Sequence, residues 1–240
     1  MTRKWIILRE ILDTLRPHIE AGIPLVGLEP SCLAVFRDEL KNLMPHDEDA
    51  RRLSQQSYLL SEFLEKKAPH YQPPQFKRKA IVHGHCHHKS IMKMHDEQAV
   101  LSKLRLDFQV LDSGCCGMAG AFGFEKDHYD ISIKVGERVL LPAVRSADEE
   151  TLIIADGFSC REQIAQMTDR HALHLAEVLH MAIQQKQDGT AGGLSEEGSR
   201  STNPEHRDLS KLVPAALVSI GGLLIGGILI WQLKRKRGEQ

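Results

Sequence analysis

The sequence lacks the features that identify nucleic-acid-binding, secreted and dinucleotide-binding proteins. Its 240 residues carry 31 basic and 32 acidic side chains, so no net positive charge predicts a nucleic-acid partner. It contains no glycine-rich dinucleotide fingerprint of any kind. Arg9 and Glu10 interrupt the apolar residues near the N-terminus, which is not the pattern of a signal peptide. The length is still sufficient to bury a sizeable core in one large or two small domains.

The cysteine pattern also excludes common site types. Five cysteines, an odd number, without a signal peptide argue against a secreted disulfide framework, and the Cys-x-x-Cys pairs of many zinc sites are absent. What is present is an adjacent pair, Cys115–Cys116, in the glycine-rich segment 113–123. On a glycine turn two neighbouring thiols can both contact one bound group, and backbone N–H groups can donate to sulfur. The alternative is a tight turn with two buried thiols.

Short apolar runs alternate with segments of helical periodicity, which predicts an α/β fold with a parallel sheet. The expected strands are residues 24–28, 80–82, 108–112 and 151–155. The expected helices are residues 5–21, 33–44, 57–67, 89–104, 128–144, a helix from 161, and 173–185, with 45–52 as a loop. Every cysteine follows one of the four strands directly. Because ligand crevices lie beyond the carboxyl ends of parallel strands, we expect the five thiols at one edge.

An internal similarity predicts two repeated units. Residues 23–32 form an apolar run that ends in Ser-Cys before a helix, and residues 152–160 do the same. We therefore expect residues 1–67 to be the remnant of a first repeat and 68–185 to be a complete second repeat. The cysteine pair of the first repeat would then lie before Met1, as if this chain were the end of something longer.

The C-terminal part changes character. Residues 186–211 are rich in Gly, Ser, Glu and Thr and predict a flexible linker, and 234–240 form a basic tail. Residues 212–233 carry no charge and reach the roughly 20 residues needed to cross a bilayer, so we expect a transmembrane helix rather than a buried core helix. The basic tail favours the cytoplasmic side for itself. We nevertheless expect a membrane protein with its soluble domain in the cytoplasm, since reducible thiol sites persist there.

Cys86, Cys115, Cys116 and Cys160 form a candidate four-thiolate set. Four thiolates suit an iron–sulfur cluster or a structural zinc ion. Adjacent cysteines fit a larger multi-iron object more easily than one tetrahedral zinc ion, so we expect a cluster. Zinc binding and redox chemistry of a strained Cys115–Cys116 disulfide are the alternatives.

Four histidines surround Cys86, namely His83, His85, His87 and His88. They cannot all face inward from one loop, so we expect one or two of them to donate hydrogen bonds to the site without being ligands. Lys89 begins the next predicted helix, where it either offsets thiolate charge or is solvated.

These motifs resemble the cysteine-rich CCG-domain proteins. That group includes the cysteine-rich subunit of heterodisulfide reductase, the iron–sulfur subunits of glycolate oxidase and anaerobic glycerol-3-phosphate dehydrogenase, and the C-terminal part of FAD-linked oxidases of the D-lactate dehydrogenase type. The similarity covers roughly residues 5–182, and its motifs are residues 29–32, 85–89, 114–120 and 157–161.

The resemblance implies a 4Fe–4S cluster, cubane or noncubane, held by Cys86, Cys115, Cys116 and Cys160. Cys32 is expected either to be a fifth ligand that reaches the cofactor across the repeats or to be an orphan. The FAD domain and the ferredoxin-like cysteine motifs of the fused enzymes are missing here. We therefore expect an oxidoreductase component that receives electrons from a flavoprotein dehydrogenase subunit, which binds FAD and oxidises a 2-hydroxy acid such as D-lactate or glycolate. A quinone or another acceptor would then receive the electrons from this component. The alternative is a degenerate scaffold without a cluster, or a zinc-binding protein, that tethers a partner to the membrane.

Overall fold

A computed structural model describes residues 3–189. The predicted transmembrane helix and basic tail, and most of the predicted linker, lie outside these residues. Within residues 3–189, no helix combines the length and the apolar character that a membrane crossing requires.

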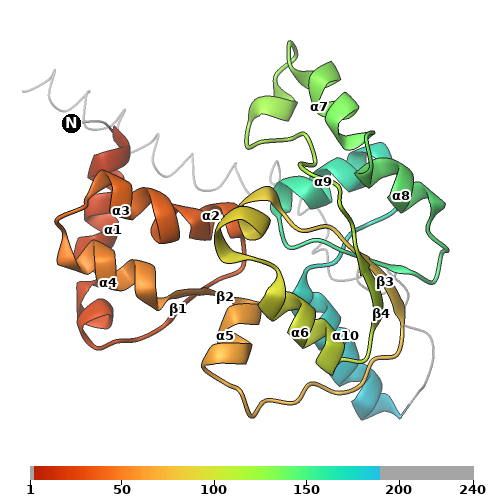
Figure 1. Ribbon diagram of the computed structural model, residues 1–240, viewed down its shortest axis with the longest axis horizontal. Helices are drawn as coiled ribbons and strands as arrows, with labels where there is room; N and C mark the ends of the chain where they lie inside the picture. The colour runs from red at the N-terminus through yellow and green to blue at the C-terminus, as the bar shows by residue number, and fades with distance from the viewer. Residues whose placement is uncertain (1–2, 190–240) are drawn as a thin grey trace, which may run out of the picture. The chain divides into compact units, whose positions relative to one another are not determined.

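The N-terminal half contains two parallel strands embedded among helices (Figure 1). In chain order its elements are α1 (Arg3–Glu20), β1 (Leu25–Gly27), α2 (Pro30–Ala34), the π-helical turn η1 (Val35–Glu39), α3 (Leu40–Leu43), α4 (Glu48–Gln56), β2 (Ser57–Leu59) and α5 (Leu60–Lys66). Leu8 and Leu12 of α1 pack with Leu40 of α3 and Leu53 of α4 in one apolar cluster. The loop expected at 45–52 is largely α4, which Asp47 caps by accepting from the Ala50 N–H.

Strand β2 is an element that the sequence analysis missed. Residues 57–67 were expected to be one helix, but Ser57–Leu59 pair in parallel with Leu25–Gly27 before α5 begins. Glu62 turns the chain from strand to helix, because its carboxylate accepts the N–H of Leu59 at 2.9 Å. The cysteines therefore follow strands of two sheets rather than one. Cys32 follows β1, and the other four follow strands of a second sheet.

The C-terminal half carries the second parallel sheet. In chain order its elements are β3 (Lys79–Val82), the π-helical turn η2 (His88–Met92), α6 (His95–Lys103), β4 (Asp107–Val110), the 3₁₀ turn η3 (Phe122–Phe124), α7 (Tyr129–Gly136), α8 (Leu140–Ser146), β5 (Leu152–Ile154), α9 (Phe158–Met167) and α10 (Leu175–Asp188). The expected helix 128–144 is thus two helices, and α10 extends into the first residues of the predicted linker.

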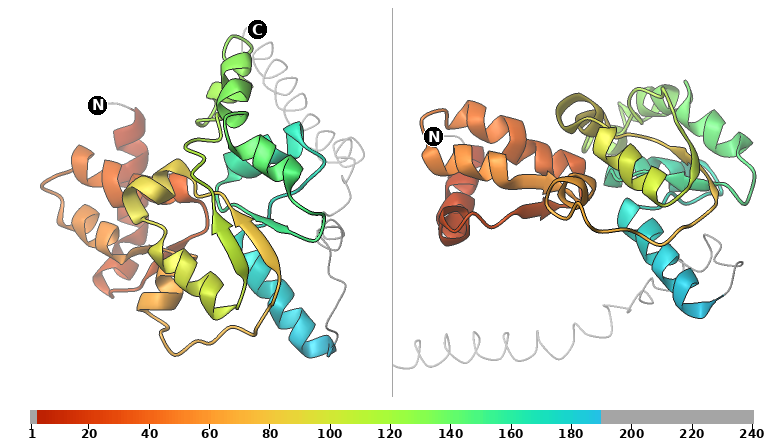
Figure 2. Two further views of the ribbon diagram at one scale, coloured as in Figure 1. Left: turned by 45° about the vertical axis from the view of Figure 1, so that its right-hand side comes forward. Right: turned by 60° about the horizontal axis from the view of Figure 1, so that its bottom comes forward.

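Side-chain alternation places helices on both faces of this sheet (Figure 2). Val82 and Ile154 face a core shared with α6 and α10, whereas Ile81 and Ile153 face a core shared with α8 and α9. The strand order is β4-β3-β5, so the chain leaves β3 to one side and later returns to the other. Such a reversal opens a crevice at the carboxyl ends of the strands. The parallel α/β fold expected from the sequence is confirmed.

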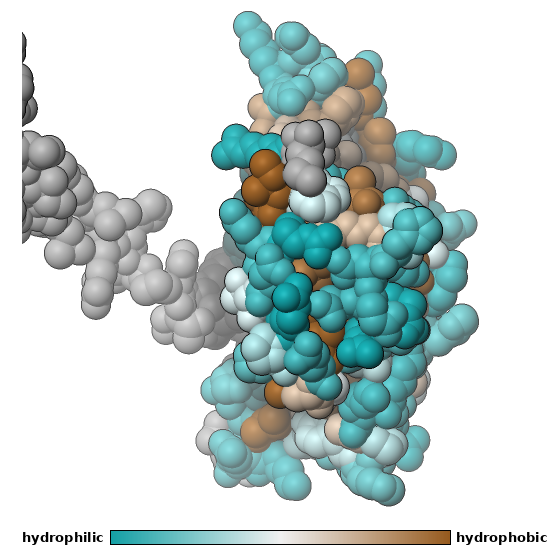
Figure 3. All heavy atoms as spheres, turned by 90° about the vertical axis from the view of Figure 1, so that its left-hand side faces the viewer, coloured by the Kyte–Doolittle hydropathy of each residue, from teal (hydrophilic) through white to brown (hydrophobic). Residues whose placement is uncertain are grey.

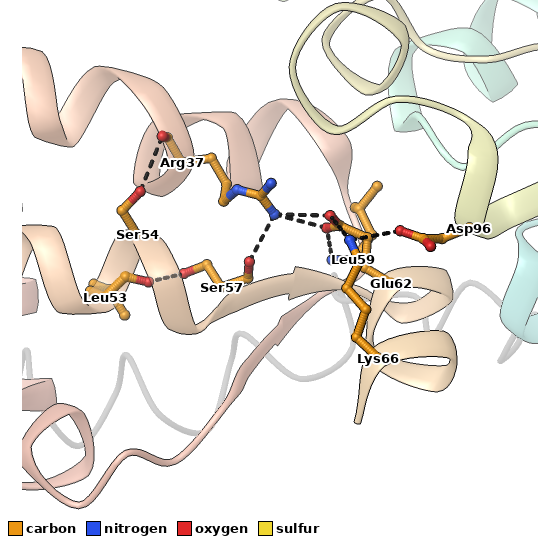
Figure 4. Close-up of polar contacts among 8 residues, drawn as sticks. All are labelled: Arg37, Leu53, Ser54, Ser57, Leu59, Glu62, Lys66 and Asp96. Atoms are coloured by element: carbon orange, nitrogen blue, oxygen red, sulfur yellow. Dashed lines mark hydrogen bonds and ion pairs between the residues drawn. The ribbon is translucent and has the colours of Figure 1, made fainter. Parts of the chain in front are cut away.

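An ionic network centred on one buried carboxylate joins the two halves (Figure 4). The Glu62 carboxylate, 1% exposed, pairs with Arg37 at 2.9 Å and with Lys66 at 3.1 Å, and Lys66 also reaches Asp96 of α6 at 2.8 Å. A second link is His174, whose Nδ1 accepts the Ala176 N–H, so that Nε2 donates to the Leu28 carbonyl at 2.7 Å.

The face that the N-terminal helices present is mostly hydrophilic, with isolated apolar side chains (Figure 3). Exposed ion pairs such as Arg16–Asp13 and Arg51–Glu48 lie on these helices. The part of this face that is visible is therefore mainly polar.

Candidate functional site

All five cysteines line one cavity of about 830 Å³. Cys86 follows β3, the Cys115–Cys116 pair follows β4, and Cys160 follows β5, so three neighbouring strands deliver four of the thiols. Cys32 enters from the other sheet. The cavity is lined by Glu29, Ser31, Cys32, His85, Cys86, His87, Cys115, Cys116, Ala119, Gly120, Ala121, Phe124, Phe158, Ser159 and Cys160.

The adjacent cysteines lie on a turn that requires glycine. Gly114 and Gly117 have φ angles of 61° and 104°, in the region that favours glycine. A Cβ at Gly117 would lie 2.1 Å from the carbonyl oxygen of Ser132 in α7, so the backbone must approach that helix closely. The Gly117 N–H donates to the Cys115 sulfur at 3.4 Å, as expected for a turn that stabilises negative sulfur.

The Cys86 loop packs against the Cys160 loop through His85. A Cβ at Gly157 would lie 2.5 Å from the His85 ring, so this glycine leaves room for the imidazole. Nδ1 of His85 accepts the His87 N–H at 3.2 Å and lies 3.9 Å from the Cys86 sulfur. His85 is therefore a neighbour of the thiols that sequence spacing alone did not single out from the other histidines.

Cys160 is the third residue of α9 and is almost fully buried. Its pKa lies well below the ordinary value, chiefly because the Cys116 thiol donates to it. The His83 imidazole faces the same sulfur and lowers that pKa further, although Nε2 has no partner at hydrogen-bond geometry. Nδ1 of His83 is held 2.6 Å from Oγ of Ser113, which fixes the ring.

The four thiols lie close enough to shift the pKa of one another. Hydrogen bonds from Cys116 and Cys86 hold the pKa of Cys115 far below its usual range. The same bonds raise the pKa of Cys86 and of Cys116, and burial raises both further. A bound cation would favour the thiolate form of all four side chains.

Cys32 differs from the other four. The residue as a whole is exposed. Partial burial of its sulfur, and after that the neighbouring Glu29 carboxylate, still raise the pKa of its thiol. Glu29 caps α2 by accepting the Cys32 N–H at 2.7 Å. The structure thus brings Cys32 to the cavity but surrounds it with negative charge.

Lys89 and His88 were expected beside the thiols, but both contact other parts of the protein. Lys89 donates to the Gly114 carbonyl at 2.8 Å and so ties the Cys86 loop to the cysteine turn. His88 points away from the cavity toward Glu97 of α6, with Nδ1 and Oε2 3.1 Å apart. Glu97 was not singled out by the sequence, because an acidic residue in the first turn of a helix usually caps it and faces solvent.

The thiol spacing bears on what the site can hold. Among residues 3–189, no three cysteine sulfurs all lie within 4.8 Å of one another. Sulfurs bound to one zinc ion at 2.3 Å would be roughly 3.8 Å apart. The described thiols are therefore spaced more widely than the ligands of one zinc ion.

Similar proteins are dehydrogenases or parts of them. D-2-hydroxyglutarate dehydrogenase of Pseudomonas putida is 30% identical over 167 residues, which make up 69% of this chain and 16% of that protein. One subunit of the anaerobic glycerol-3-phosphate dehydrogenase of Escherichia coli is 29% identical over 171 residues, 68% of this chain and 41% of that polypeptide. D-2-hydroxyglutarate dehydrogenase of Escherichia coli is 22% identical over 173 residues, 71% of this chain and 17% of that protein.

The chain spans less than half the length of these curated relatives. No protein-family model and no solved structure matches it. The chain is therefore related to a part of oxidoreductases, and the similarity covers about two thirds of it.

Proposed function

We propose that this chain is an iron–sulfur electron-transfer component of a flavin-linked dehydrogenase. The single observation that carries the proposal is the convergence of all five cysteines on one cavity at the carboxyl ends of parallel strands. Cys86, Cys115, Cys116 and Cys160 hold a 4Fe–4S cluster, and Cys32 contacts it from the other sheet. When bound, the cluster accepts and releases single electrons.

The residues around the cavity are suited to a negatively charged cluster. The thiols of Cys115, Cys116 and Cys86 each have a backbone donor directed at them. The Gly117 N–H adds to the lowering of the Cys115 pKa, and the N–H groups of Met118 and His87 oppose the larger effects that raise the pKa of Cys116 and Cys86. His83 and His85 add positive potential at Cys160. Donors to sulfur and charge near a cluster set its reduction potential, so these groups tune the electron transfer.

Phe124 and Phe158 form an apolar rim at the cavity. They are 57% and 54% exposed although both line the cavity with the cysteines. Apolar side chains beside a cluster exclude water on one side and offer a docking partner a surface through which electrons can pass. The proposed partner is a flavoprotein subunit or domain that binds FAD.

The relatives support a substrate class for that partner. Two of them are named for D-2-hydroxyglutarate, and one for glycerol-3-phosphate. We assign the partner a 2-hydroxy acid as its electron donor, and a quinone or another acceptor to the onward step. Residues 212–233 would anchor this assembly in the membrane, with the cysteine domain in the cytoplasm.

We also propose that the chain consists of two related repeats. Cys32 is the third residue of α2 after β1, and Cys160 is the third residue of α9 after β5. This equivalence supports a CCG-type module in which residues 1–67 are the remnant of one repeat and 68–185 are a second, complete one.

The experiment is anaerobic purification and reconstitution of the full chain, followed by analysis of iron, acid-labile sulfide and zinc. We expect about four iron and four sulfide per chain, and no cluster in the Cys116→Ser variant. Cys32→Ser is the matched control and retains the cluster, since Cys32 is not one of the four proposed ligands. Stoichiometric zinc without iron would instead favour the zinc-binding alternative.

A further inference from the structure

A buried group of ligand-type side chains lies behind the cysteine loops, outside the cavity. It consists of His88 on η2, Glu97 in the first turn of α6, and Asp156 just after β5. One potential ligand atom from each side chain lies within 4.8 Å of the other two. His88 and Glu97 are 1% exposed and Asp156 is 4% exposed, so water does not solvate this concentration of charge.

The polar atoms of this group lack the hydrogen bonds that burial normally requires. Neither ring nitrogen of His88 has a hydrogen-bond partner, and neither does Oε2 of Glu97. Nδ1 of His88 and Oε2 of Glu97 are 3.1 Å apart, yet they are not aligned as donor and acceptor. Leaving such buried atoms without a partner destabilises the folded protein.

A shared cation explains this arrangement. Two ligands that both lie 2.0–2.2 Å from one zinc-sized ion are roughly 3.0–3.5 Å apart, with lone pairs rather than hydrogens between them. The 3.1 Å separation falls in that range. Two carboxylates would also neutralise a divalent charge.

The third ligand is already oriented by its surroundings. Oδ1 of Asp156 accepts the Leu175 N–H at 2.9 Å and lies 3.5 Å from Nε2 of His174. Carboxylates that bind metals are characteristically held by such outer hydrogen bonds.

We propose that His88, Glu97 and Asp156 bind one divalent cation that accepts both imidazole and carboxylate ligands, such as Zn²⁺, Mn²⁺ or Fe²⁺. The ion ties the loop after β3, which carries Cys86, to the segment after β5, which carries Cys160. Three protein ligands leave further positions for water. The site does not depend on a cluster in the cavity.

The test is titration of the full chain, freed of metal by chelation, with Mn²⁺. Room-temperature EPR counts the free ion, and Mn²⁺ prefers oxygen and imidazole ligands to the thiolates of the cavity. We expect one bound Mn²⁺ per chain and a raised Tm. Glu97→Gln, which removes the charge but keeps the shape, should weaken binding at least about 100-fold, because it replaces a ligand rather than an outer contact.

Controls separate this site from the cavity. Glu149→Gln, at an exposed carboxylate, and Cys116→Ser should both bind Mn²⁺ as the unchanged chain does. Asp156→Asn keeps the acceptor for the Leu175 N–H and repeats the test if Glu97→Gln does not fold. Absence of Mn²⁺ binding in the unchanged chain, equal binding in Glu97→Gln, or its loss in Cys116→Ser would each overturn the proposal.

Discussion

At the scale of single residues, the cysteine turn depends on one glycine more than on its neighbours. Gly114 and Gly117 both have positive φ, but only Gly117 meets another part of the chain, the Ser132 carbonyl of α7. The sequence predicts a glycine turn there. It cannot show which glycine is indispensable, because that follows from a helix that begins twelve residues later.

Gly117→Ala should therefore be far more damaging than Gly114→Ala. The left-handed conformation alone costs about 1–2 kcal/mol with a Cβ present, which is the loss expected for Gly114→Ala. Gly117→Ala adds a clash with backbone and should lower the free energy of unfolding by more than about 3 kcal/mol. Urea unfolding of both variants measures this, and equal losses would contradict the described turn.

Cys32 and Cys160 show how local charge separates two equivalent positions. Each is the third residue of a helix that follows a strand, but Glu29 precedes the first helix and Gly157 precedes the second. The carboxylate helps to raise the pKa of Cys32, whereas Cys116 and His83 lower that of Cys160. Sequence similarity predicts the equivalence, and the different chemistry follows from contacts with the rest of the fold.

At the scale of the elements, α5 is fixed by a buried carboxylate. Burial alone would raise the pKa of Glu62, but the Leu59 N–H and the charges of Arg37 and Lys66 outweigh it and lower that pKa. The ionised form therefore contributes stability above the unfolded pKa near 4.3, and this contribution is lost as pH falls through the lower folded pKa.

Glu62→Gln should lower the free energy of unfolding by about 1–3 kcal/mol at pH 7, because Arg37 and Lys66 lose a charged acceptor. Arg37 keeps the Ser57 carbonyl and Lys66 keeps Asp96. The difference from the unchanged chain should narrow as the pH falls below about 4.3. Urea unfolding across this range measures both effects. The exposed Glu149→Gln should change stability by less than about 0.5 kcal/mol; a loss in Glu62→Gln that does not vary with pH would contradict the assigned charge state.

The elements that the sequence predicted well are those with strong local patterns. The four expected strands lie at the apolar runs, since alternating side chains face two cores. Strand β2 could not be predicted, because three residues between two helices show no period and are held by pairing with distant β1. Glu97 was missed for a related reason, since its partners His88 and Asp156 come from other elements.

At the scale of the whole molecule, the two halves meet where function is expected. Lys66 with Asp96 and His174 with the Leu28 carbonyl join the halves near the strands that carry the cysteines. Cys32 therefore lines a cavity whose other thiols all come from the C-terminal half. This chain corresponds to only 16% and 17% of the length of two of the D-2-hydroxyglutarate dehydrogenases to which it is similar.

The measurement that tests the central claim most directly is the Mössbauer spectrum of the full chain reconstituted anaerobically with ⁵⁷Fe. We predict sulfur-coordinated iron in one spin-coupled cluster per chain, which changes oxidation state on reduction and is absent from Cys116→Ser. Isolated mononuclear iron, or no bound iron at all, would contradict the account.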